Sequence, residues 1–217
     1  MRKSKKPQNK IVKYLREVSV VVIGVAITLS ASYLITRSSE KRDMRLYMEA
    51  IKIELEENTK IINKTINYLK PTVNYSAYLR SHNKKSLNKD SINNYLHACF
   101  YVESFIFKKN AFETFKSSGM MRLISNKELL LAIWDMYDKL IILKQYIDEY
   151  ETRRWNYMEK EIPLIENVEE LSKHDYIFMY DFYKIEYSEG ILIESEQVLK
   201  KIKEVLLKLE ETKMNKI

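Results

Sequence analysis

The sequence of 217 residues combines 46% hydrophobic with 31% charged residues, so the chain has enough apolar content to form a packed core. Its net charge of +7 would suit a nucleic-acid-binding protein, but residues 1–45 hold 11 of the 37 Lys and Arg and only 3 of the 30 Asp and Glu. The rest of the chain therefore carries 26 basic and 27 acidic residues, and we expect no nucleic-acid partner.

The content of special residues limits the fold as well. Only 3 Gly and 3 Pro are present, which favours long helices over many short strands. Cys99 is the single cysteine, so no disulfide can form within the chain. We interpret it as a small buried side chain.

The first predicted element is a transmembrane helix at residues 18–36. Between Glu17 and Arg37 lie 19 residues without a charge, VSVVVIGVAITLSASYLIT. As a helix they extend roughly 28 Å, close to the ~30 Å hydrocarbon core of a bilayer. A cleaved signal peptide is the main alternative, because Ser30-Ala31-Ser32 offers small residues at a suitable place. The apolar run continues past them and basic residues follow at once, which favours an anchor; a buried core helix is the third reading.

The charges on both sides of this segment predict its orientation. Seven Lys and Arg precede it, whereas four follow it, mixed with acidic residues. We therefore expect a basic cytoplasmic tail at 1–17 and the larger domain outside the membrane. Gly24, Thr28 and Ser32 would let two spans approach closely, although small residues are common in spans. The expected partners are the lipid bilayer and either a second copy of the chain or another membrane protein.

The predicted soluble domain, residues 37–217, begins with a long juxtamembrane helix at 40–70. Its apolar positions recur every three or four residues and define what we call the seam: Met48, Ile51, Leu55, Asn58, Ile62 and Leu69. Another helix should cover the seam, either from this chain or from a second copy. Glu54, Glu56 and Glu57 are expected on the opposite, solvated face. Pro71 is expected to end the helix or to start the next one.

Central helices are expected within residues 91–161. Residues 97–107 fit either a buried helix or a strand. Asn110 followed by Glu113 is a capping pattern for a short helix that closes at Gly119. The run Ser125-Asn126-Lys127-Glu128 is a capping box that starts the longest soluble helix, from Asn126 to about Lys160.

A C-terminal helix is expected at about 175–213, because apolar residues recur there at helical spacing from Ile191 to Leu209. Three long predicted helices, in a chain with few helix-breaking residues, predict an all-α fold. In this fold, one N-terminal transmembrane helix is followed by an elongated antiparallel helical bundle.

The sequence holds no pattern for a metal, cofactor or catalytic site. None of His82, His97 and His174 follows a glutamate at the spacing of a di-metal helical bundle. One cysteine cannot build a thiolate site, and three scattered glycines cannot build a phosphate-binding loop. We expect no metal, no cofactor and no catalytic residue, with an enzyme kept as a third option because catalytic residues can converge from distant positions.

Residues 111–130, AFETFKSSGMMRLISNKELL, resemble the signature of a family of uncharacterised bacterial single-span membrane proteins with an AFETxKSSG-like motif. Val22-Ile23-Gly24 in the span and the stretch IELEEN at 53–58 add to the resemblance. The resemblance implies a single-span architecture and a location in a bacterial inner (plasma) membrane, and it implies no particular chemistry. Within the motif, Lys116, Ser117 and Ser118 are candidate anion ligands, and the alternative is that they end a helix.

Two functions fit these observations. The first is a membrane-tethered, non-enzymatic helical module for interaction or scaffolding. The second is a ligand-sensing domain outside the membrane that acts through a partner, because helical bundles can hold small molecules between their helices. Aromatic residues that would line such a pocket are Tyr176, Phe178, Tyr180, Phe182 and Tyr183.

Overall fold

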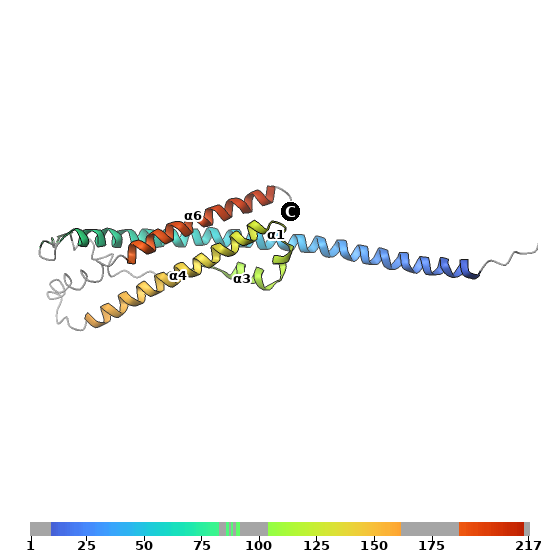
Figure 1. The fold of residues 1–217 in the computed structure, drawn as a ribbon, viewed down its shortest axis with the longest axis horizontal. Coiled ribbons are helices and arrows are strands. Elements are labelled where there is room, and N and C mark those ends of the chain that lie inside the picture. Colours follow the sequence, from blue (N-terminus) through green and yellow to red (C-terminus); the bar gives the residue numbers. More distant parts are fainter. Residues whose placement is uncertain are drawn as a thin grey trace, which may run out of the picture. The chain divides into compact units, whose positions relative to one another are not determined.

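The computed structural model describes residues 10–82, 86, 88, 90–91, 104–161 and 187–214. The elements of regular structure in these ranges are helices (Figure 1). They are α1 (Lys10–Ser81), α3 (Asn110–Ser117), the 3-10 helix η2 (Met120–Leu123), α4 (Lys127–Glu161) and α6 (Tyr187–Met214). No strand occurs in the described part of the chain, and the prediction of an all-α fold is confirmed.

The chain divides into two compact units, residues 1–46 and 47–217. In the first unit, α1 carries the predicted transmembrane segment, and the apolar side chains of this segment are exposed, including Val20, Ile27 and Leu34. Within the described ranges, α1 is the helix that is long and apolar enough to cross a membrane, and none of its most apolar stretch is buried. A signal sequence has the same properties, so the segment is a candidate span.

The second unit contains the rest of α1, which continues through Pro71 to Ser81 and so corrects the prediction that Pro71 ends the helix or starts the next one. Proline removes one backbone hydrogen bond and clashes with the preceding turn, at a cost of about 3 kcal/mol in a helix interior. Beyond Pro71, the side chains of Thr72, Tyr75, Ser76 and Leu79 are buried. Their burial offsets that cost, because most of a helix's stability in a protein comes from tertiary packing.

Contacts along the second unit fix the directions of α1 and α4. Glu54 bonds to Tyr137 and Tyr68 bonds to Glu151, so the partners are 83 residues apart in sequence at both places. A constant difference means that α1 and α4 run parallel. The chain returns toward the start of this part of α1 before α4 begins, since Lys108 is bonded to Asn58.

Helix α6 runs antiparallel to both of its neighbours, whereas α1 and α4 are parallel to each other, so only two of these three helix pairs are antiparallel as predicted. Toward α1, Lys52 pairs with Glu210 at 3.0 Å and Arg80 pairs with Glu189 at 2.9 Å, so the numbers fall on one helix as they rise on the other. The same order holds for α6 against α4, because Lys201 pairs with Asp135 and Tyr187 is bonded to Arg153.

The seam faces the inside of the second unit. Its six residues are all buried, with Ile51, Leu55, Asn58 and Ile62 at 0% exposure. Each apolar side chain of this size contributes about 1.5–3 kcal/mol when it is removed from water. The facing residues from α4 and α6 are buried as well, among them Ile133, Leu140, Val198 and Ile202. Of the two alternatives for the helix that covers the seam, the structure has the one within this chain.

Several predicted boundaries differ from the observed ones. Residues 104–109 are neither helix nor strand, so the expected helix or strand at 97–107 does not extend through them. The remainder of that prediction, at 97–103, lies outside the described residues, as does the stretch 175–186 of the expected C-terminal helix. The observed α6 covers the rest, at Tyr187–Met214.

Candidate functional site

The two serines predicted as anion ligands lie at the C-terminal end of α3. Ser117 Oγ donates to the Thr114 carbonyl at 3.0 Å, and Ser118 Oγ donates to the Phe115 carbonyl at 2.7 Å. Ser118 Oγ also accepts the backbone N–H of Met120 at 3.2 Å. Both hydroxyls therefore satisfy backbone groups at a helix end, which matches the alternative interpretation of the motif.

The third candidate, Lys116, points along the same helix. Its ammonium lies 4.0 Å from a Glu113 carboxylate oxygen and 5.5 Å from the centre of the Trp134 ring. Gly119 follows with a φ of +71°, the left-handed conformation predicted at the end of this helix. The motif therefore forms a helix end and a turn, and the hydroxyls of Ser117 and Ser118 are already bonded to backbone groups.

The start of α3 is held by Glu54 of α1, which corrects two predictions. The Glu54 carboxylate accepts the backbone N–H of Ala111 at 2.7 Å and that of Phe112 at 3.3 Å, and it accepts the Tyr137 hydroxyl at 2.5 Å. Glu54 is buried rather than on a solvated face. Asn110 is the first residue of α3, the capping position is Lys109, and no side-chain capping bond forms there. A carboxylate at a helix N-terminus satisfies orphan N–H groups and interacts favourably with the helix dipole, so the distant glutamate takes the role expected of the local cap.

Asn58 explains the polar position in the seam. Its side-chain amide donates to the Lys108 carbonyl and accepts the Lys108 backbone N–H, both at 2.7 Å. These paired bonds fix the irregular segment 104–109 next to α1. The break in the apolar repeat is therefore an attachment point for backbone, which a buried amide can satisfy on both sides.

The start of α4 differs from the predicted capping box by one residue. Asn126 Oδ1 accepts the backbone N–H of Leu129 at 3.0 Å, and α4 begins at Lys127. Asn126 is thus the capping residue, in place of Ser125. Both residue types bear an acceptor oxygen and are favoured at this position, so the local sequence does not separate them.

A buried ionic cluster lies between α1 and α4. Arg154 is 1% exposed; its guanidinium donates to the Glu151 carboxylate and, at 2.6 Å, to the Tyr68 hydroxyl. Tyr68 donates in turn to Glu151 at 3.1 Å. Burial raises the pKa of Glu151 above its usual range, and burial also raises the pKa of Tyr68. The cluster lies mostly inside the unit, with the Glu151 side chain 16% exposed.

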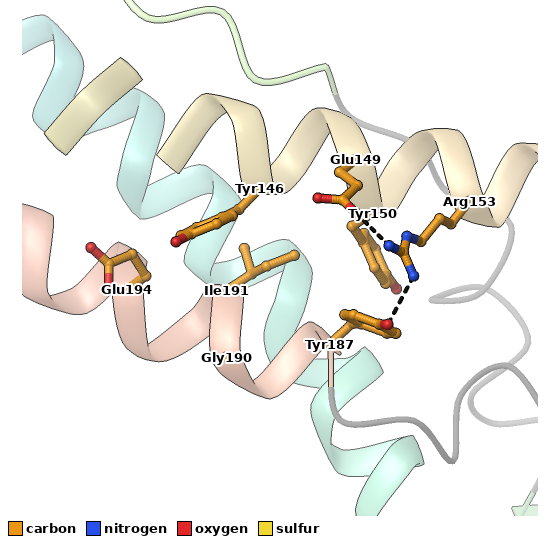
Figure 2. Close-up of a pocket in the computed structure, with 8 residues that line it drawn as sticks. All are labelled: Tyr146, Glu149, Tyr150, Arg153, Tyr187, Gly190, Ile191 and Glu194. Carbon is orange, nitrogen blue, oxygen red and sulfur yellow. Dashed lines mark hydrogen bonds and ion pairs between the residues drawn. The ribbon is translucent and has the colours of Figure 1, made fainter. Parts of the chain in front are cut away.

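The candidate functional site is a groove between α4 and α6, with a volume of about 480 Å³ (Figure 2). Pockets that hold small organic molecules have volumes of about 300–1,000 Å³. Three tyrosines, one isoleucine, three charged residues and one glycine line the groove. The lining residues are Tyr146, Glu149, Tyr150 and Arg153 from α4, and Tyr187, Gly190, Ile191 and Glu194 from α6.

Most of the charge in the groove is paired. The Arg153 guanidinium donates to the Glu149 carboxylate and, at 2.8 Å, to the Tyr187 hydroxyl, and it lies 4.9 Å from the centre of the Tyr187 ring. The hydrogen bond to Glu149 raises the pKa of Arg153, which stays a cation at any physiological pH. Figure 2 shows these three side chains together, with Glu194 apart from them and toward Tyr146. Glu194 makes no hydrogen bond or ion pair to another described residue.

Gly190 keeps one wall of the groove open. A Cβ atom placed on it would meet no heavy atom within 4 Å, so no crowding in the described structure requires glycine there. Glycine inside a helix costs about 1 kcal/mol relative to alanine. The missing side chain leaves open space in the groove next to the backbone of α6.

The sequence did not reveal this site. The five aromatic residues expected to line a pocket, 176–183, lie outside the described residues, as do His97, Cys99 and His174. The available signal was the spacing of Tyr146, Glu149, Tyr150 and Arg153, which places the four side chains on adjoining positions of two helical turns. In the described ranges, no three His, Cys, Asp or Glu side chains are grouped so that they would hold a metal ion.

Comparisons of the chain with protein-family models, with curated proteins and with solved structures found no match.

Proposed function

We propose that this chain is a membrane-anchored helical interaction module without catalytic activity of its own. The observation that carries this proposal is α1, a single helix that contains both the exposed apolar segment 18–36 and the buried seam of the second unit. An uncharged helix of that length is stable in a bilayer, where its backbone is internally bonded. The seam makes the same helix part of the core of the second unit.

The roles of the ionisable groups support a binding function over an enzymatic one. Glu54 holds the start of α3, and Glu151 is paired with the buried Arg154. The groove instead gathers aromatic rings around a few charges, a composition typical of binding pockets.

We place the partner's contact at the groove and not at the seam. The six seam residues are covered within this chain, so a second copy would have to displace the core to reach them. At the groove, Tyr146 and Tyr187 are 50% and 44% exposed. Tyrosine is enriched at interfaces because it supplies a large apolar ring and a hydroxyl at low entropic cost.

For the location, we propose a bacterial plasma membrane with residues 1–17 in the cytoplasm and the second unit outside. The support is the excess of basic residues before the apolar segment. A Cys99→Ser variant with a single new cysteine at the exposed Lys203 tests the orientation. A membrane-impermeant maleimide should label it in intact cells. Labelling only after permeabilisation would reverse the proposed orientation.

Site-specific photo-cross-linking of the full-length chain in its membrane tests the interaction. A photoreactive residue at Tyr146 should give an adduct of defined mass in the membrane fraction. The matched control is the same residue at Lys203, which is exposed on α6 and does not line the groove. Absence of an adduct at Tyr146, or equal adducts at both positions, would contradict the proposal.

The groove itself favours a second candidate function, the sensing of a small ligand outside the membrane. Its volume of about 480 Å³ suits a small molecule. Both of its helices contact α1, through Arg154 to Tyr68 and through Glu189 to Arg80, so a ligand that shifts α4 against α6 would act on the helix that carries the apolar segment. A ligand of this kind should raise the melting temperature of the full-length protein in detergent. No shift with any class of metabolite would count against sensing.

A further inference from the structure

The chemistry of the groove narrows the kind of ligand that it can take. Its tyrosine rings from both helices, together with Ile191, present apolar surface to a molecule in the groove. Aromatic faces carry negative electrostatic potential and attract cations within about 6 Å of the ring centre. The groove already contains one such contact, because Arg153 lies over the Tyr187 ring.

The charges in the groove favour a cationic ligand over an anionic one. Arg153 is the cation among the lining residues, and it is bonded to both Glu149 and Tyr187. Two carboxylates against one guanidinium leave the lining with one net negative charge. The carboxylate without an ionic partner among the described residues is Glu194, which lies toward Tyr146 in Figure 2.

We propose that the groove binds an organic cation, an amine whose ammonium group pairs with Glu194 and whose apolar body lies against Tyr146 and Ile191. The space beside Gly190 admits the body of the ligand. The inference rests on the second candidate function and specifies its ligand class. The same ammonium chemistry is present in a free amine and in a lysine side chain of a partner protein, and the experiment separates the two.

The probe is phenethylammonium, an aromatic ring with a short ammonium arm, titrated into the full-length protein in detergent by calorimetry. Its matched control is phenylpropionate, which has a similar ring and arm with the opposite charge. We expect millimolar, saturable binding of the cation and no binding of the anion, because a ligand of this size gains little energy in total. Equal binding of both probes would overturn the proposal.

Two substitutions locate the site. Glu194→Gln should weaken binding of phenethylammonium about tenfold, since it removes the ionic partner and keeps the side-chain size. Glu196→Gln changes an exposed glutamate of the same helix that does not line the groove, and it should leave affinity unchanged.

Gly190→Leu should abolish binding by filling the groove. Leucine is a better helix former than glycine, so the melting temperature of this variant should not fall. Unchanged affinity in both Glu194→Gln and Gly190→Leu would overturn the proposal.

A final arm separates the sources of the ammonium group. Acetyl-Phe-Lys-amide carries a lysine ammonium on a peptide and acetyl-Phe-Ala-amide does not. Binding of the lysine peptide with the same dependence on Glu194 supports the proposed chemistry with a protein as its source. Binding of phenethylammonium alone supports it with a free amine. Failure of every cation, while the Tyr146 adduct still forms in the membrane, would overturn this inference and leave the interaction module in place.

Discussion

Arg153 and Arg154 are consecutive in α4, and their surroundings differ in almost every respect. Arg154 is buried between α1 and α4, where Glu151 and Tyr68 accept its hydrogen bonds. Arg153 lies at the groove, where it is half-exposed and bonded to Glu149 and Tyr187. Each has a glutamate and a tyrosine as partners, so the residue types do not distinguish the two regions.

The difference indicates which ionic groups stabilise the fold and which can bind a ligand. In the interior, each charged group has partners fixed by two helices, and leaving one of them unpaired there is costly. At the groove, water can solvate any group that loses its partner, so the same residue types can exchange partners at little cost. A ligand can therefore compete for groups in the groove and not for those in the core.

The largest test of this comparison is the pair of substitutions Arg154→Met and Arg153→Met. Arg154→Met should lower the free energy of unfolding by roughly 3 kcal/mol, the lower end of the range for a buried pair, because Glu151, whose side chain is 16% exposed, loses its cation. Arg153→Met should leave it nearly unchanged, since an exposed pair contributes little. Chemical denaturation of the full-length protein in detergent, followed by tryptophan fluorescence, measures both. Similar losses in the two variants would remove the distinction between core and groove.

A second test compares two glutamates of α1. Glu54→Ala should lower the free energy of unfolding by about 2–3 kcal/mol. The substitution leaves two backbone N–H groups of α3 and the Tyr137 hydroxyl without their acceptor. The control is Glu56→Ala, whose half-exposed carboxylate lies 3.7 Å from Lys52 and should contribute less than about 1 kcal/mol. The same denaturation experiment applies. Equal effects would return Glu54 to the solvated face on which the sequence placed it.

These two positions also indicate how far sequence analysis reaches for this chain. Periodicity predicted the long helices and the seam, because both depend on neighbours within one helix. It placed Glu54 on the wrong side, since the groups that bind it lie more than 50 residues away. Pro71 was misread for a similar reason, as the burial of Tyr75 and Leu79 is a tertiary property.

The groove was harder to foresee than the core. It is formed by two helices that meet antiparallel, and nothing in the sequence of α4 alone says that Tyr146 faces Ile191 of α6. The register between helices decides it, and that register follows from packing of the whole unit. The resemblance of residues 111–130 to a family signature gave architecture, and the residues it singled out, Lys116, Ser117 and Ser118, proved to complete a helix end.

The pH dependence of stability gives a smaller and more specific test. Burial raises the pKa of Glu151 in the folded protein above that of the unfolded chain, where it is near 4.5. The folded state therefore binds the proton more tightly, so this group stabilises the fold below pH 4.5, and the contribution is lost as pH rises through the folded pKa. Glu151→Gln should remove this part of the decline in melting temperature as the pH rises above 4.5. An unchanged profile in Glu151→Gln would contradict the assignment.

The smallest expected effects separate two glycines, one of the groove and one of the α3 turn. Gly190→Ala should raise the free energy of unfolding by about 0.5–1 kcal/mol, because α6 gains a better helix former and the added Cβ meets nothing within 4 Å. Gly119→Ala should lower it by about 1 kcal/mol, because Gly119 has a φ of +71° that alanine adopts only with strain. Melting temperatures of the two variants should therefore shift in opposite directions. A loss of stability in Gly190→Ala would mean that glycine is required there by packing, and the open wall of the groove could then no longer be explained as space kept for a ligand.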